Sequence, residues 1–179
     1  MDRILILLDL TRLFFTARRL HINIGYKQLG DEIKQELVKH GSAVEVVGFT
    51  TVFDGNVAQA AFLSSLEDTG ILVRRYPPIL GKNNYLAEML AYSDAEDSIS
   101  TFLVTNAEEA VRCCATYKDS GKDCSLVYFS GDIPRSWSIA DLSYDLSDPE
   151  ALKRVGDFAL GHKHGATGDA AQLRLHLGA

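Results

Sequence analysis

Cysteine, proline and tryptophan are scarce in this sequence. Its 179 residues include three cysteines, four prolines and one tryptophan. The cysteines are odd in number and form no Cys-x-x-Cys pair, which argues against a disulfide framework and against a zinc knuckle. Cys113 and Cys114 fall in a helical pattern, so we interpret them as small buried side chains in a reducing cytoplasm.

Long hydrophobic runs are also missing. The apolar run over residues 4–8 has the length of a strand and is too short to span a membrane. Asp9 and Arg12 interrupt the N-terminal segment before a cleavage site could follow, which does not fit a signal peptide. We therefore expect a cytoplasmic protein with no membrane partner.

An excess of positive charge is absent as well, since the formal net charge is −6 at pH 7. This balance does not by itself favour nucleic-acid binding, although a local basic patch can lie on an acidic protein. No Gly-x-Gly-x-x-Gly, Walker or Gly-x-Ser-x-Gly pattern occurs. Nucleotide binding of those kinds and a nucleophile elbow are therefore unsupported.

Apolar, β-branched stretches alternate along the chain with amphipathic stretches. We expect strands over residues 3–8, 44–53, 71–76, 101–104 and 125–130, and a short edge strand within 144–146. We expect helices over residues 11–20, 26–40, 57–68, 83–93 and 106–120. This alternation predicts an α/β fold, a three-layer α/β/α sandwich with a mainly parallel sheet. One domain would span residues 1–147, and residues 148–179 would form an amphipathic helix and a glycine-containing tail.

Acidic residues follow two of the predicted strands. In an open parallel sheet the site lies off the carboxyl ends of the strands. Asp9 follows the first strand, Glu109 follows the strand over 101–104, and Glu88 lies in the helix over 83–93. Brought together, such acids would hold Mg²⁺ or Mn²⁺ and support phosphodiester hydrolysis. Asp9 would serve equally as a helix N-cap, and Glu109 as a favourable charge at a helix start, so both interpretations stay open.

Three segments carry a resemblance to a known family. They are LLDLTRLFFTARRL (residues 7–20), TFLVTNAEEAVRCCATYKDSGKDCSLVYF (101–129) and IADLSYDL (139–146). Together with the order of elements over residues 3–146, they resemble the NYN branch of the PIN-like nucleases, close to the LabA-like group. The resemblance implies a PIN-like fold, which is associated with RNA cleavage or RNA binding.

The sequence departs from the family pattern at its acidic site. The family's Asp-Gly-x-Asn motif reads Asp9-Leu10-Thr11-Arg12, and asparagines stand at residues 83–84 where a second acid is expected. The family's Ser-Gly-Asp-Gly-Asp run becomes residues 105–109, in which Ala107 replaces one acid and Glu109 the other. The resemblance thus implies Asp9 and Glu109 as metal ligands. Glu88, one turn beyond the asparagines, would add a ligand if its helix is rotated toward Asp9.

Three functions follow from these patterns. The first is a degenerate NYN domain, impaired in catalysis, that acts by RNA binding or protein assembly. The second is an active Mg²⁺- or Mn²⁺-dependent ribonuclease that uses Asp9, Glu109 and Glu88. The third is a protein–protein interaction module without nucleic acid, docking through residues 148–179. Candidate nucleic-acid contacts are Arg12, Arg18, Arg19, Lys82, Arg74 and Arg75. The pairs at residues 18–19 and 74–75 would alternatively be solvated surface charges, and Arg12 would alternatively pair with an acid in place of the metal.

Overall fold

The computed structural model describes residues 2–22, 24–38, 41–79, 84–95, 98, 100–129 and 143–145. Its elements, in chain order, are β1 (Arg3–Asp9), α1 (Leu10–Leu20), α2 (Tyr26–Leu37), β2 (Ala43–Thr51), α3 (Val57–Asp68), β3 (Leu72–Tyr76), α4 (Asn84–Ala95), β4 (Ser100–Val104), α5 (Glu108–Asp119), β5 (Asp123–Tyr128) and β6 (Ser143–Asp145). Every strand and helix expected over residues 1–147 is present, and the predicted ends shift by a few residues. The largest shift is at α2, which ends at Leu37 instead of residue 40. The helix expected after residue 148 lies outside the described residues.

All strands of the sheet run parallel. The sheet has six strands in the order β3-β2-β1-β4-β5-β6, which confirms the predicted parallel α/β architecture. The chain builds outward from β1 to β3, then returns to the other side of β1 and continues from β4 to β6. The order therefore reverses between β1 and β4, and in such sheets the crevice beyond the carboxyl ends of the strands at this point is where ligands bind.

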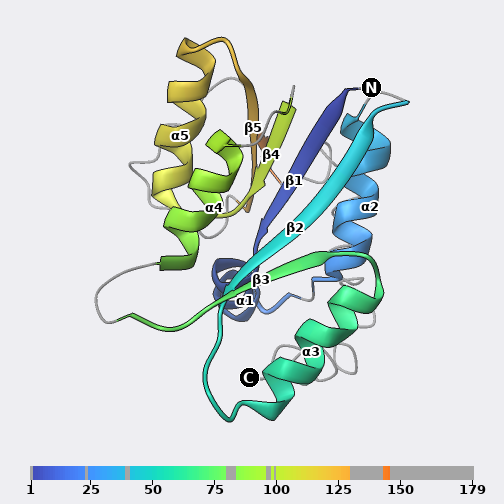
Figure 1. The fold of residues 1–179 in the computed structure, drawn as a ribbon, viewed down its shortest axis with the longest axis vertical. Helices are drawn as coiled ribbons and strands as arrows, with labels where there is room; N and C mark the ends of the chain where they lie inside the picture. Colours follow the sequence, from blue (N-terminus) through green and yellow to red (C-terminus); the bar gives the residue numbers. More distant parts are fainter. Residues whose placement is uncertain are drawn as a thin grey trace.

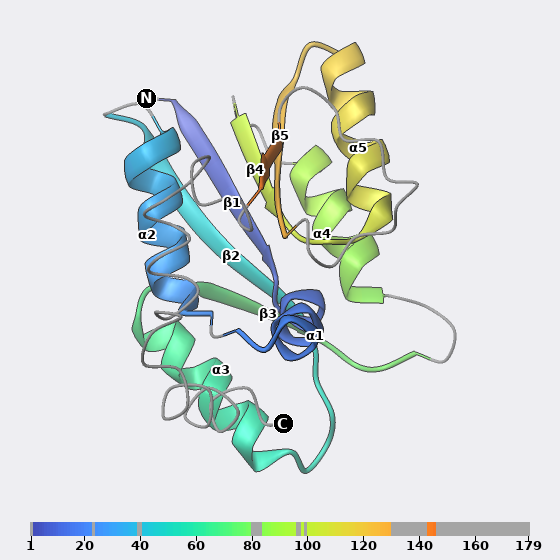
Figure 2. The same ribbon diagram turned by 180° about the vertical axis from the view of Figure 1, so that it is seen from behind.

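Helices cover both faces of the sheet (Figures 1 and 2). Alternate residues of a strand point to opposite faces. On β1, Ile6 and Leu8 belong to the core beneath α1, α2 and α3, whereas Leu5 and Leu7 belong to the core beneath α4 and α5. The fold is a three-layer α/β/α sandwich, as the alternation of elements predicts. No described helix is both long and apolar enough to cross a lipid bilayer.

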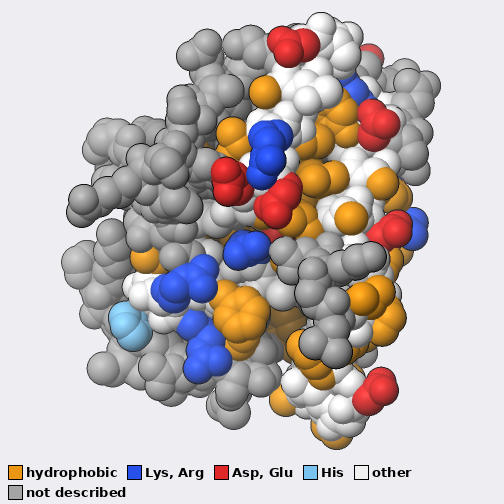
Figure 3. Space-filling view, turned by 90° about the vertical axis from the view of Figure 1, so that its left-hand side faces the viewer, with side chains coloured by type: hydrophobic (Ala, Val, Ile, Leu, Met, Phe, Trp, Pro, Cys, Tyr) orange, Lys and Arg blue, Asp and Glu red, His pale blue; other side chains and the backbone are white. Residues whose placement is uncertain are grey.

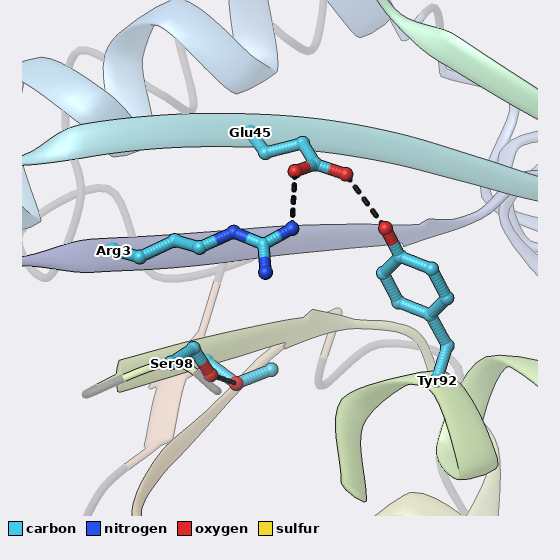
Figure 4. A network of polar contacts seen from close by, with 5 residues as sticks. Arg3, Glu45, Tyr92 and Ser98 are labelled. Atoms are coloured by element: carbon cyan, nitrogen blue, oxygen red, sulfur yellow. Dashed lines mark hydrogen bonds and ion pairs between the residues drawn. The ribbon is translucent and has the colours of Figure 1, made fainter. Parts of the chain in front are cut away.

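A polar network ties β1, β2 and α4 together away from the carboxyl ends of the strands (Figure 4). Arg3 Nη2 donates to Glu45 Oε2 at 2.6 Å, and Tyr92 Oη donates to Glu45 Oε1 at 2.6 Å. Hydrogen bonds from Arg3 and then Tyr92 hold the pKa of Glu45 below its ordinary value. Nearby, the hydroxyls of Ser98 and Thr101 lie 3.2 Å apart. These contacts join β1, β2 and α4 near the amino ends of the strands. They do not involve the carboxyl ends of the strands.

The cysteines pack between α5 and the sheet. Cys114 and Cys124 are buried, and their Sγ atoms lie 3.2 Å apart, while Cys113 is half-buried. Burial is the main cause that raises the pKa of Cys113, which disfavours its thiolate. The predicted burial is confirmed for Cys114 and is only partial for Cys113.

Candidate functional site

The candidate site lies where the strand order reverses. Asp9 is the last residue of β1, and Thr105 follows directly after β4. The two strands are in register up to the pair Leu8 and Val104. The fold therefore places Asp9 and Thr105 side by side at the switch point of the sheet, which is the place between β1 and β4 where the strand order reverses.

Asp9 is fully buried and its carboxyl group is held by neighbouring donors. Thr105 Oγ1 donates to Oδ2 at 2.7 Å, and the backbone N–H of Arg12 donates to Oδ1 at 2.8 Å. The hydroxyl of Tyr85, from α4, also hydrogen-bonds to this carboxyl group. The contact with Arg12 makes Asp9 the N-cap of α1, so the capping interpretation is confirmed. Both carboxyl oxygens are thus already engaged within the protein.

Burial controls the protonation of Asp9. Removal from water raises the pKa of its carboxyl from 3.8 to about 6, because a buried charge loses its hydration. The hydrogen bond from Thr105, the backbone N–H of Arg12, the positive charge of Arg12 and the hydroxyl of Tyr85 each pull the pKa down, but together they do not cancel the effect of burial. Around pH 6 the group therefore exchanges between its neutral and charged forms.

Two buried polar atoms near this carboxyl have no hydrogen-bond partner among the described residues. They are the hydroxyl of Tyr26, a residue that is 2% exposed, and Nε of the half-buried Arg12. Burial, and then the charge of Asp9, raise the pKa of Tyr26, which keeps its hydroxyl protonated. Arg12 also hydrogen-bonds to Tyr85 and lowers the pKa of that residue, opposing the effect of burial. Arg12 thus brings a permanent positive charge to the carboxyl at the switch point.

The other predicted acids lie outside this buried network. Glu109, in the first turn of α5, and Glu88, on α4, are both exposed. The charge of Glu88 acts on Tyr76, whose pKa it raises after the larger effect of burial. Tyr85, one turn before Glu88, is the α4 residue that reaches Asp9. Within the described part of the chain, no group of three or more His, Cys, Asp or Glu side chains is placed to hold a metal ion, so the described residues do not fit the predicted three-carboxylate site.

The predicted basic residues fall into separate groups. Arg74 and Arg75 are consecutive on β3 and point to opposite faces of the sheet. The guanidinium of Arg74 lies 4.8 Å from the centroid of the Tyr92 ring, whereas Arg75 Nη1 pairs with Glu67 Oε1 at 2.7 Å. These two arginines therefore do not form one basic pair, and Lys82 lies outside the described residues.

The arginines of α1 lie together on one side of that helix. Arg18 and Arg19 are exposed in its last turn, and the half-buried Arg12 is in its first turn. Arg18 Cζ lies 5.6 Å from the centroid of the Phe14 ring. Figure 3 shows Lys and Arg side chains gathered beside a histidine and a large hydrophobic side chain on one face of the molecule. Because Asp9 caps the N-terminus of α1, the arginine side of this helix begins next to the switch point.

Sequence reasoning did not predict the partners of Asp9. Thr105, Tyr85 and Tyr26 form or line the buried network, and each is an ordinary core residue by its local pattern. One usable signal was present: a hydroxyl residue, Thr105, directly follows the apolar end of β4 (residues 102–104), at the edge of the sheet where Asp9 also lies. The rotation of α4 about its axis turns Tyr85, and not Glu88, toward Asp9. No comparable signal in the sequence predicts this rotation.

Comparison with known proteins gives a likeness of fold. No family model matches this sequence, and no curated protein matches it. The structure resembles the crystal structure of a protein of unknown function from Vibrio parahaemolyticus, with a TM-score of 0.59 and 16% sequence identity, over 75% of this chain and 85% of that one. At this level of identity the likeness concerns the fold alone, and it supports the three-layer α/β architecture.

Proposed function

We propose that this chain is an RNA-binding domain of the PIN-like, NYN type in which Asp9 stabilises the fold and does not hold a catalytic metal ion. The observation that carries the proposal is the basic side of α1, where Arg12, Arg18 and Arg19 gather on the helix that starts at the switch point. Arginine is well suited to phosphate contacts, because its planar guanidinium donates several hydrogen bonds in a fixed geometry.

The geometry around Asp9 supports the non-catalytic half of the proposal. A carboxylate that binds Mg²⁺ must offer an accessible lone pair in near-octahedral surroundings. The oxygens of Asp9 accept from Thr105 and from the backbone of Arg12, and the positive charge of Arg12 also acts on this carboxyl. Glu109 is exposed in the first turn of α5, where its charge is favoured by the helix dipole. A metal would have to use a remaining lone pair of this fully buried carboxyl or displace one of its donors, and it would be repelled by the positive charge of Arg12.

The experiment that tests RNA binding is fluorescence anisotropy of a labelled single-stranded RNA, titrated with the full chain at several salt concentrations. The double variant Arg18→Gln/Arg19→Gln should bind more weakly and should lower the slope of log K against log salt by about 1.4, because each lost phosphate contact removes about 0.7. The matched control is Lys27→Gln/Lys34→Gln, which removes two exposed cations from α2. It should leave affinity and slope close to those of the wild type.

Other outcomes would point to the alternatives. The absence of binding at low salt would contradict RNA binding and favour a protein-interaction module. Equal loss in both double variants would contradict the role of α1 in RNA binding. RNA cleavage that needs Mn²⁺ and disappears in Asp9→Asn would instead support an active ribonuclease using Asp9, Glu109 and Glu88.

A further inference from the structure

Phe15 is exposed although its helix has a well-defined buried side. On α1 the buried residues are Leu10, Leu13, Thr16 and Ala17. At 3.6 residues per turn, Phe15 projects almost directly away from this buried side, and 47% of its surface is exposed. Packing among the described residues therefore gives no reason for an aromatic ring at this position.

Cationic side chains surround this ring on the helix surface. Arg12 lies three residues before Phe15, and Arg18 and Arg19 lie three and four residues after it. Side chains at these spacings are neighbours on a helix, with Cβ atoms about 5–6 Å apart. The exposed ring therefore lies at the centre of the basic side of α1.

The ring of Phe15 also packs against the neighbouring ring of Phe14. The centroids of Phe14 and Phe15 are 5.1 Å apart, with an interplanar angle of 64°, an edge-to-face contact. The Arg18 guanidinium packs over Phe14 in turn. These contacts restrict the rotation of Phe15, so a planar partner can bind to it with a smaller loss of conformational entropy.

We infer that Phe15 is a stacking platform for an unpaired base, and that the α1 surface binds single-stranded RNA in preference to duplex. This inference rests on the proposed RNA binding and specifies its substrate class. An aromatic ring flanked by arginines matches a strand whose phosphates contact the cations while a base stacks on the ring. In a duplex the bases are stacked on one another and their faces are not available to a protein ring.

The test measures anisotropy with a labelled single-stranded oligouridylate and with an RNA duplex of the same length. The variants are Phe15→Leu, which keeps an apolar side chain but removes the aromatic face, and the matched control Phe53→Leu. Phe53 is 55% exposed and lies in the loop after β2, away from α1 in sequence. Since stacking on one base contributes about 1–3 kcal/mol, Phe15→Leu should weaken single-strand binding by at least about fivefold.

The other expected results separate the contribution of base stacking to affinity from that of phosphate contacts. Phe53→Leu should bind like the wild type, and Phe15→Leu should keep the wild-type salt slope because no phosphate contact is lost. Both variants should unfold at the wild-type temperature, since both rings are exposed.

Each remaining outcome overturns a stated part of the account. If the wild type binds RNA with the expected salt dependence but Phe15→Leu has no effect, or single strand and duplex bind equally, stacking is overturned and RNA binding stands. If both leucine variants lose affinity alike, the aromatic role of Phe15 is overturned. If the wild type binds no RNA but binds vesicles of anionic lipid, both the stacking and the proposed function are overturned.

Discussion

The hydroxyl of Thr105 donates a hydrogen bond of 2.7 Å to Oδ2 of Asp9, across 96 residues of sequence. This bond joins the ends of β1 and β4 at the point where the strand order reverses. The same carboxyl caps α1 through the backbone of Arg12. The acid that the family resemblance marks as a metal ligand therefore connects two strands and a helix.

Replacing Thr105 by valine tests this connection. Thr105→Val keeps the shape of the side chain but leaves Asp9 Oδ2 and the backbone N–H of Ala107, which donates to Thr105 Oγ1 at 3.0 Å, without this partner. The free energy of unfolding at pH 7 should fall by about 2–3 kcal/mol, measured by urea denaturation.

The matched control for this change is Thr116→Val. Thr116 is exposed on α5 and its hydroxyl donates to the carbonyl of Arg112 within the helix. Its replacement should change the free energy of unfolding by less than about 0.5 kcal/mol. Equal effects of the two valine variants would show that the bond to Asp9 adds nothing to stability.

Asp9 should make stability depend on pH in a defined window. Its pKa is about 6 in the folded protein and about 3.8 when exposed to water. Between these values the folded state binds more protons than the unfolded state, so stability falls as pH rises through the window. From pH 4 to pH 7 the wild type should lose about 2–3 kcal/mol of unfolding free energy relative to Asp9→Asn, which cannot titrate there. Parallel stability profiles of the two proteins would contradict a raised pKa of Asp9.

Removing the buried hydroxyl of Tyr26 should stabilise the protein, which is unusual for a substitution in the core. Because this hydroxyl is buried without a hydrogen-bond partner among the described residues, Tyr26→Phe should raise the free energy of unfolding by about 1 kcal/mol. The control Tyr92→Phe loses a bond to Glu45 and should lower it by about 1 kcal/mol. Thermal and urea unfolding of both variants measure the difference. Destabilisation by Tyr26→Phe comparable to that of Tyr92→Phe would mean that the Tyr26 hydroxyl is hydrogen-bonded in solution.

The architecture was predictable because strand and helix patterns are local. The apolar run before Asp9 and the glycine after Ser120 specify elements without reference to the rest of the chain. The edge at which Asp9 lies followed from the general geometry of parallel sheets. The order of the strands, and hence the pairing of Asp9 with Thr105, depends on contacts distant in sequence and had no local signal.

The details of the site depended on rotations that tertiary packing selects. On α4, burial of Tyr85, Leu86 and Met89 against the sheet turns Glu88 to the surface. On β3, strand alternation sends Arg74 and Arg75 to opposite faces, so adjacent charges in sequence do not make one patch. In both cases the residue type was noticed from the sequence, but its direction was set by the neighbouring elements.

Calorimetric titration of Mn²⁺ into the wild type and into Asp9→Asn tests the central claim most directly. Because the Asp9 carboxyl is engaged by Thr105 and Arg12, we expect no saturable heat up to millimolar Mn²⁺ and identical traces for the two proteins. Saturation at micromolar Mn²⁺ that is lost in Asp9→Asn would contradict the account, since it would make Asp9 a metal ligand and restore the ribonuclease as the leading function.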